Sequence, residues 1–404
     1  MSHTLISFLG KARKGDGGKY RTANYDFQGE LKTTQFFGLG LKEIIQPDTL
    51  IILGTTGSMW DVFYEAFAES EQQADHWMAL SESVLANQVS ESQLATCAID
   101  LSEKLGLECI LKIIPYGMNE QEQSEILKIM AGDVHSNEHV SLDLTHGLRH
   151  LPMLGLLSAM YLKTAKQVSI EGIYSGALEL TKNNITPVIR LDGLLKISSW
   201  INALDGFDKT GDIAPFSDLL QQEGMEEETA NLLKEAAFHE GVLNIPSAIH
   251  PLKEFSKKTE NTLPGIADLF KDSLSKRINW KEEKNIYLCQ REKALFYLNQ
   301  GDYVRAAALG YEATITRQFL SDGYNSTIGD FDERQDAKED LEYELRKQRT
   351  DLWEQYKLLR NIRNSLVHAN RVDQAKITKI FRKEDDIRKN LTDLFKILLP
   401  KNMN

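Results

Sequence analysis

The sequence predicts an α/β domain followed by an all-helical region. Up to about residue 195, short apolar runs alternate with helix-patterned segments. This alternation is typical of a doubly wound domain with a mostly parallel sheet. From about residue 198 almost every segment has a helical pattern. We therefore expect an α/β domain at 1–195, a helical connecting module at 196–285 and a helical domain at 286–404.

The expected strands of the first half are nearly continuous apolar runs, as in sheets covered on both faces. They are Leu5–Leu9, Leu50–Leu53, Cys109–Ile114, Val140–Leu144 and Val168–Tyr174. Helix-patterned segments lie between them, at Thr33–Ile45, Trp60–Ser70, Ser92–Leu105, Glu120–Met130 and Leu151–Thr164.

Composition narrows the class of protein. Of the 404 residues, 42% are apolar and 26% are charged, as in soluble globular proteins. No apolar run approaches the roughly 18–20 residues of a membrane span, and the start lacks a signal-peptide pattern, so we expect a cytoplasmic protein without membrane contact. Three cysteines without ligand-like spacing predict neither a disulfide framework nor a metal site. The net charge, 47 − 59 = −12, argues against nonspecific DNA coating.

Three loops of similar character follow expected strands, at 10–19, 54–60 and 145–150. Their glycines let backbone amides approach a ligand, and hydroxyls and a helix N-terminus supply donors to an anion. Ligands of such sheets bind beyond the carboxyl ends of the strands, so the loops predict a ligand site. The alternative is that these residues only end strands and cap helices. The loops match neither a Walker A nor a GxGxxG motif.

His146 and His150 have the i, i+4 spacing that can suit a metal. No acidic or cysteine partner is evident for them, so we expect no metal there.

Four segments resemble the CARF domain of CRISPR-associated Csx-type proteins: Lys19–Phe27, Leu53–Asp61, Asp143–Gly147 and Tyr174–Glu179. The resemblance covers about residues 1–195. It implies a Rossmann-like fold, a homodimer or higher oligomer of dimers, and a cyclic oligoadenylate activator on the two-fold axis, with cyclic tetra-adenylate the commoner ring. The ligand contacts that it implies are Gly10, Lys11, Thr55, Ser58, Met59, Thr145, His146, Gly147 and Arg149.

Near the C-terminus, Arg363 and His368 belong to one short helical segment. RNA carries its own nucleophile, the 2′-hydroxyl, so cleavage without a metal needs only proton transfer and stabilisation of charge on the phosphate. Histidine suits the first task and arginine the second. In a regular helix about 140° separates residues i and i+5, so the pair shares a face only if the helix ends or bends, or across two copies. Without further context, such a pair is more typical of ordinary surface residues than of a catalytic site.

The segment Arg363–His368 resembles the Arg-x4–6-His motif of HEPN ribonucleases, with Asn364 as the polar residue after the arginine. Asp302–Ala313 resembles a HEPN core helix. The resemblance covers roughly residues 286–404. It implies a dimeric, metal-independent endoribonuclease for single-stranded RNA, without a cofactor, whose catalytic residues are Arg363, Asn364 and His368. Arg360 and Arg371 either help to hold RNA or are ordinary surface charge.

Together the two resemblances imply a ribonuclease of CRISPR antiviral defence that a cyclic oligoadenylate switches on, and the 2′-hydroxyl chemistry predicts 2′,3′-cyclic phosphate ends. One alternative is a sensing regulator or scaffold without catalysis. Another places slow cleavage of the bound activator near Thr145.

Overall fold

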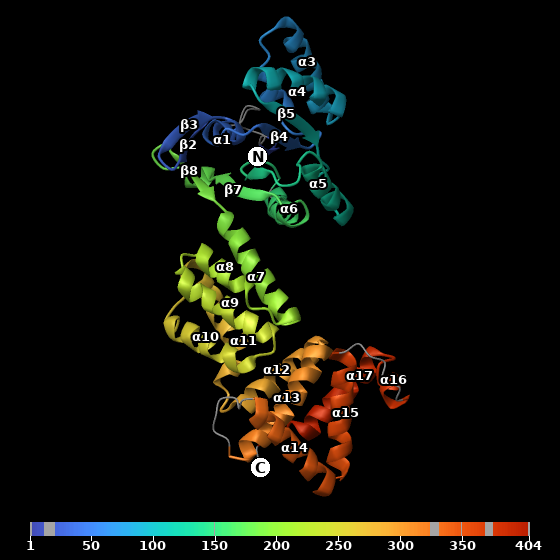
Figure 1. Ribbon diagram of the computed structural model, residues 1–404. Coiled ribbons are helices and arrows are strands. Elements are labelled where there is room, and N and C mark those ends of the chain that lie inside the picture. The colour runs from blue at the N-terminus through green and yellow to red at the C-terminus, as the bar shows by residue number, and fades with distance from the viewer. Residues whose placement is uncertain are drawn as a thin grey trace. The chain divides into compact units, whose positions relative to one another are not determined.

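The computed structural model describes residues 2–11, 21–148, 150–323, 331–348, 350–367 and 375–402. It consists of two compact units, Met1–Leu195 and Lys196–Asn404 (Figure 1). The first is α/β and the second is all-helical, so the predicted fold class is confirmed. No helix among the described residues combines the length and apolarity that crossing a membrane requires.

The described part of the first unit contains one eight-stranded sheet with the order β3-β2-β8-β7-β6-β1-β4-β5. The five strands from β7 to β5 in this order are parallel, β8 is antiparallel to β7, and β2 and β3 form an antiparallel pair beside β8. The strands are β1 (His3–Leu9), β2 (Ala23–Phe27), β3 (Glu30–Thr34), β4 (Thr49–Gly54), β5 (Glu108–Ile113), β6 (His139–Asp143), β7 (Ser169–Gly176) and β8 (Thr186–Arg190).

Helices cover both faces of this sheet, which explains the continuous apolar strands. Leu5 and Leu9 of β1 pack in one apolar cluster with α1, α2, α3 and α4, whereas Ile6 and Phe8 pack in another with α5 and α6. Figure 1 shows α5 and α6 on the side of the sheet opposite α1. These helices are α1 (Phe37–Ile45), α2 (Trp60–Glu65), α3 (Glu71–Ala86), α4 (Glu91–Leu105), α5 (Glu120–Gly132) and α6 (Leu151–Ala165), with a 3₁₀ turn η1 (Leu178–Leu180).

Two predicted helices of this unit are wrong in part. The segment Thr33–Ile45 begins with the last residues of β3, and its helix starts only at Phe37. Within the segment Trp60–Ser70 the helix ends at Glu65. Ser70 does not continue this helix but is the N-cap of the next one, where it and Gln73 form reciprocal hydrogen bonds. Strands β2, β3 and β8 were not predicted, since they lack continuous apolar runs.

The described residues of the second unit form two apolar clusters. One surrounds Trp200, Phe216 and Phe255, and the other surrounds Tyr287 and Tyr356. The boundary expected between residues 285 and 286 stays a prediction. The helices are α7 (Asp192–Thr210), which spans the junction of the units, α8 (Pro215–Gln222), α9 (Glu227–Gly241), α10 (Ile245–Lys258), η2 (Gly265–Phe270), α11 (Lys271–Arg277), η3 (Asn279–Glu282), α12 (Ile286–Gln300), α13 (Tyr303–Ser321), α14 (Phe331–Gln348), α15 (Thr350–Val367), α16 (Ala375–Ile380) and α17 (Glu384–Leu398).

Candidate functional site

The three glycine- and hydroxyl-rich loops leave one edge of the sheet. They follow β1, β4 and β6, and these strands are parallel neighbours with β1 in the middle. Their carboxyl ends therefore bring Gly10, the Thr55–Met59 loop and the Thr145–Leu148 loop to the same edge. We call this group of loops the sensing edge.

Ser58 joins two of these loops. Its Oγ donates a hydrogen bond to the carbonyl oxygen of Leu9 at 2.8 Å and accepts one from the amide of Thr55 at 2.9 Å. The amide of Met59 donates to the carbonyl oxygen of Gly10 at 3.0 Å. Thr55, Ser58 and Met59 are buried. The Ser58 hydroxyl and the Met59 amide therefore hold the β4 loop against the end of β1, and none of these three side chains lines an open surface.

Asp143 holds the third loop, Thr145–Leu148, in place through hydrogen bonds. Its buried carboxylate accepts hydrogen bonds from Ser7 Oγ at 2.6 Å and from the amide of Thr145 at 2.8 Å. Burial raises the pKa of Asp143, and both hydrogen bonds act in the opposite direction. Thr145 Oγ1 in turn accepts a hydrogen bond from the amide of Gly176 at 2.8 Å. The loop is thus tied to β1 and to the end of β7.

His146 points inward from the sensing edge. Its Nε2 accepts a hydrogen bond from the amide of Phe37, the first residue of α1, at 3.4 Å, which requires the neutral ring. Burial lowers the pKa of His146, while the nearby Asp143 acts in the opposite direction. His150 Nε2 instead contacts the carbonyl oxygen of Tyr116 at 2.7 Å. The two histidines thus have separate partners on different segments.

The exposed residues of the sensing edge are few among those described. Lys11, Gly147 and Leu148 face solvent. Gly147 has φ +108°, and a Cβ there would lie 3.1 Å from Leu151 Cδ1, so the turn needs glycine. Arg149 lies outside the described residues.

The second candidate site is a cavity of about 460 Å³ between α13, α14 and α15, which we call the basic cavity. Arg363 and Asn364 both line it. Arg363 Nη1 donates to Asn364 Oδ1 at 3.0 Å, and the guanidinium lies 5.5 Å from the centre of the Tyr311 ring. Arg363 Nε is buried without a hydrogen-bond partner among the described residues. Helix α15 ends at Val367, and His368 lies outside the described residues, as does Arg371.

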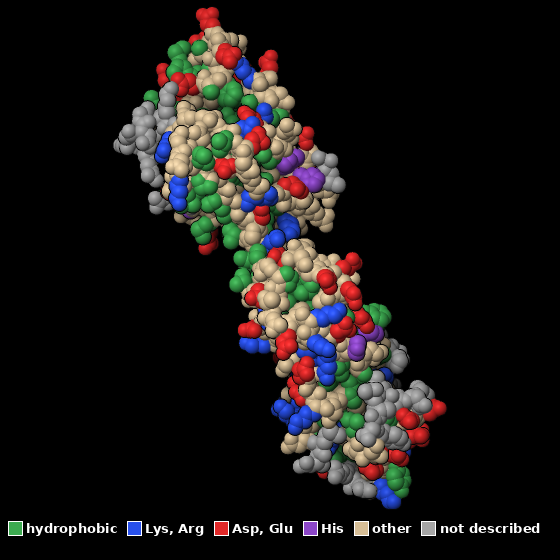
Figure 2. All heavy atoms as spheres, turned by 90° about the vertical axis from the view of Figure 1, so that its left-hand side faces the viewer, with side chains coloured by type: hydrophobic (Ala, Val, Ile, Leu, Met, Phe, Trp, Pro, Cys, Tyr) green, Lys and Arg blue, Asp and Glu red, His purple; other side chains and the backbone are tan. Residues whose placement is uncertain are grey.

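Three further cations, Arg334, Lys338 and Arg360, line the basic cavity together with Arg363 and Asn364. Arg334 donates to Glu312 at 2.7 Å and to Thr316 at 3.2 Å, and Arg360 donates to Glu342 at 2.9 Å. Lys338 has no ion-pair partner among the described residues. Figure 2 shows acidic and basic side chains interspersed on the face in view. The chain has a net charge of −12, so the cations that line the basic cavity are a local grouping in an acidic chain. Its lining residues are Tyr311, Glu312, Ile315, Arg334, Gln335, Lys338, Arg360, Arg363 and Asn364.

The basic cavity is also lined by residues that were not predicted. Arg334, Lys338 and Glu312 reach the basic cavity from α13 and α14. The only signal in the sequence is the i, i+4 spacing of Arg334 and Lys338, which a solvated charged helix shows equally well.

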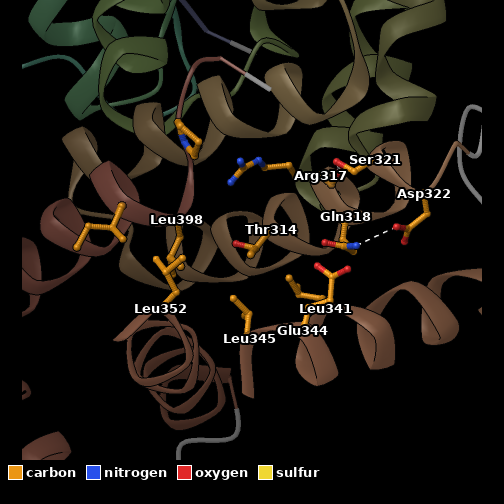
Figure 3. A pocket seen from close by; sticks show the side chains of 12 residues that line it. Thr314, Arg317, Gln318, Ser321, Asp322, Leu341, Glu344, Leu345, Leu352 and Leu398 are labelled. Atoms are coloured by element: carbon orange, nitrogen blue, oxygen red, sulfur yellow. Dashed lines mark hydrogen bonds between the residues drawn. The ribbon is translucent and has the colours of Figure 1, made fainter. Parts of the chain in front are cut away.

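Another cavity, of about 450 Å³, opens on a different side of α13 (Figure 3). Leucines from α14, α15 and α17 form one wall, and Gln318 donates to Asp322 at 2.9 Å. Arg317 and Glu344 bring opposite charges to its lining. It contains none of the predicted site residues and no grouped cations, so it does not suit a polyanion.

Comparisons with known proteins bear mainly on the first unit. Residues 4–180 match the family described as the CARF domain of the CRISPR system endoribonuclease Csx1. A CRISPR-associated protein, MJ1674 of Methanocaldococcus jannaschii, is 26% identical over 230 residues, which cover 52% of this chain and 36% of that protein. The chain thus spans about a third of the length of this relative.

A solved structure of Enterococcus italicus Csm6 bound to cyclic hexa-2′-fluoro-hexa-dAMP aligns over 100% of this chain and 97% of its own. It is 11% identical with a TM-score of 0.36, a similarity too low to bear on the fold or function of this chain. The family match covers most of the first unit, which is an α/β domain. Residues 4–180 are therefore similar to the CARF domain of Csx1, and about half of the chain is similar to a CRISPR-associated protein.

Proposed function

We propose that this protein is an endoribonuclease of CRISPR antiviral defence, activated by a cyclic oligoadenylate and independent of metal ions. The observation that carries the proposal is the basic cavity: the arginine and asparagine of an Arg-x4-His motif line a cavity with three further cations, behind a CARF domain. On this proposal residues 286–404 form a HEPN domain and residues 196–285 connect it to the sensor.

The sensing edge would bind the activator, with cyclic tetra-adenylate as the expected ring. Its phosphates carry negative charge, for which the exposed Lys11, the backbone amides of the loops and the N-terminus of α6 are suited. Two copies that present the same loops across a two-fold axis match a cyclic ligand of repeated units. The activator must bind the active arrangement more tightly than the inactive one, because otherwise it shifts no population.

Cleavage of single-stranded RNA would use the 2′-hydroxyl as the nucleophile. As the 2′-oxygen attacks phosphorus, His368 takes part in proton transfer, and the 5′-oxygen of the next nucleotide leaves with a proton. Arg363 stabilises the charge that grows on the phosphate oxygens, and Asn364 positions the phosphate or His368. The products are a 2′,3′-cyclic phosphate and a free 5′-hydroxyl. Two copies would complete one composite site in a homodimer.

The test is cleavage of a fluorogenic RNA in EDTA, with and without cyclic tetra- or hexa-adenylate. We expect one ring size to stimulate cleavage and His368→Ala to abolish the stimulated activity. Full stimulated cleavage by His368→Ala would contradict the catalytic assignment. Activator binding without any RNA cleavage would favour a non-catalytic sensor.

A further inference from the structure

A smaller cavity of about 220 Å³ adjoins the basic cavity. The two share the ion-paired residues Glu312 and Arg334 as lining. We call the smaller one the amide cavity, because Gln290 of α12 belongs to it. Its lining residues are Leu243, Asn244, Pro246, Ile286, Gln290, Glu312, Thr316, Phe319 and Arg334.

Helix α13 connects the two cavities. Glu312, Thr316 and Phe319 follow one another at i, i+4 and i+7, so they share the face of α13 that lines the amide cavity. Tyr311 and Ile315 lie on the neighbouring face and line the basic cavity. An RNA strand held in the basic cavity therefore lies next to the amide cavity, because the two cavities share Glu312 and Arg334.

Gln290 is the feature that needs an explanation. The residue is only 6% exposed, and its Oε1 is buried without a hydrogen-bond partner among the described residues. A buried amide oxygen without a partner is costly, on the order of 1–3 kcal/mol. Such an atom is expected either to bind an ordered water or to receive a donor from a ligand.

The remaining surroundings of Gln290 favour a flat ligand with an apolar face and a polar edge. Leu243, Pro246, Ile286 and Phe319 provide apolar surface. Of the two side-chain amides in the lining, Asn244 already accepts a hydrogen bond from the amide of Ser247, whereas Gln290 Oε1 has no partner among the described residues. RNA bases outside a duplex are recognised in this way, by apolar or aromatic contact with their faces and hydrogen bonds to their edges. A side-chain amide offers a donor beside an acceptor, the pattern that pairs with the edge of a base.

We propose that the amide cavity holds the base of an RNA nucleotide next to the cleaved phosphate and that Gln290 sets the base preference. This inference rests on the proposed ribonuclease function and adds the specificity site to it. The base donates a ring or exocyclic N–H to Gln290 Oε1. The phosphate on its other side lies near Arg334, Lys338 and Arg360.

Binding of uncleavable RNA tests the proposal separately from catalysis. Full-length protein is titrated with fluorescein-labelled 2′-O-methyl hexanucleotides of adenosine, cytidine or uridine, which lack the attacking hydroxyl. For the wild type we expect affinities that differ by about fivefold or more between bases. In Gln290→Leu these differences should disappear while overall binding through the phosphates persists.

Two further variants make the outcome decisive. Gln318→Leu changes a glutamine of the separate cavity in Figure 3, on the same helix bundle, and should keep the wild-type order of bases. Gln290→Glu keeps the size and an acceptor for the base N–H but replaces the amide donor beside it with a second acceptor. It should therefore change the order of bases by weakening those that present an acceptor beside their N–H, even if Gln290→Leu folds poorly. Equal wild-type affinities, or the wild-type order retained in a folded Gln290 variant, would overturn the proposal.

The two levels of inference can fail independently. RNA that is cleaved without any effect of Gln290 on base preference would remove the base site and leave the ribonuclease. A base preference that depends on Gln290, in a protein that cleaves no RNA, would leave the base site and remove the catalytic function.

Discussion

The sensing edge and the basic cavity differ in what their polar side chains contact. At the sensing edge the side chains of Ser58, Asp143 and Thr145 form hydrogen bonds with backbone groups of the loops and of neighbouring strands. In the basic cavity Lys338 has no ion-pair partner and Arg363 Nε no hydrogen-bond partner among the described residues. The first arrangement leaves backbone atoms and Lys11 to meet a ligand, whereas the second leaves side-chain cations. Substitutions at the first site should therefore affect folding, and those at the second should affect RNA.

The largest effect on stability is expected where a paired charge is most deeply buried. Lys293 and Glu240 form a buried ion pair, and Lys293 Nζ lies 4.9 Å from the centre of the Tyr297 ring. Burial raises the pKa of Glu240. Lys293→Met would leave this carboxylate buried without its cation and should lower the free energy of unfolding by about 3–5 kcal/mol, measured by urea denaturation.

The double variant Glu240→Leu/Lys293→Met is the matched control. It removes both charges and should regain most of the lost stability, because no unpaired charge remains. A double variant as unstable as the single one would show that the ring contacts of Lys293 matter more than its charge.

The next largest effect should separate catalysis from folding. Arg363→Ala removes the guanidinium that faces the proposed phosphate and should lower activator-stimulated RNA cleavage by about 100-fold or more. Its unfolding midpoint should stay close to that of the wild type, because among the described residues the guanidinium makes one hydrogen bond, with the neighbouring Asn364, and one contact with the Tyr311 ring. The exposed Arg382→Ala serves as the control and should cleave normally. Equal losses in both variants would argue that general charge, not the site, governs cleavage.

The same contrast explains which features could be predicted from the sequence. The parallel strands that carry the sensing edge are continuous apolar runs, because both faces are covered, and they were recognisable for that reason. Strands β2 and β8 were not, because their alternating or polar residues do not stand out. The inward direction of His146 depends on α1 packing beside the loop, a contact that no local pattern specifies.

The basic cavity was predictable only in part. Arg363 and Asn364 were predicted because the segment Arg363–His368 resembles the HEPN motif and follows a CARF-like region, whereas the spacing alone is that of ordinary surface residues. Arg334 and Lys338 lie on α14, a helix so rich in charge that site cations and solvated surface look alike in the sequence. Packing of α13, α14 and α15 selects which of these cations face the cavity. That selection is a tertiary property.

A smaller effect on stability is expected at the sensing edge. Ser58→Ala leaves the carbonyl of Leu9 and the amide of Thr55 without their buried partner. This should lower the free energy of unfolding of the first unit by about 1–3 kcal/mol, followed by thermal or urea unfolding. Ser124→Ala, at an exposed position of α5, should have almost no effect. An unchanged Ser58→Ala stability would mean that these loops are not held together by the Ser58 hydroxyl.

His146 should give the sensing edge a pH dependence. Burial depresses the pKa of the folded histidine below its ordinary value of about 6.5. When the pH falls below about 6.5, this histidine binds a proton more readily in the unfolded chain than in the folded protein, so the free energy of unfolding decreases. Above about pH 6.5 the histidine is neutral in both states, and the folded protein keeps its full stability. His146→Gln should lose less stability between pH 7 and pH 5 than the wild type, measured by urea unfolding at each pH. An identical slope in both proteins would place the titrating group elsewhere.

The smallest effect is expected at Lys11, and it should be on binding alone. Lys11 is exposed, so Lys11→Ala should leave the unfolding midpoint unchanged. It should weaken binding of cyclic tetra-adenylate by at most about fivefold in low salt, because an exposed charge contributes about 0.2–1 kcal/mol. The loss should shrink as ionic strength rises, since salt screens exposed charges. Isothermal titration at two salt concentrations measures both, with the exposed Lys163→Ala on the far end of α6 as the control. If Lys11→Ala instead lowers the free energy of unfolding as Ser58→Ala does, Lys11 belongs to the framework that holds the loops together. It would then not be one of the residues that only face the ligand.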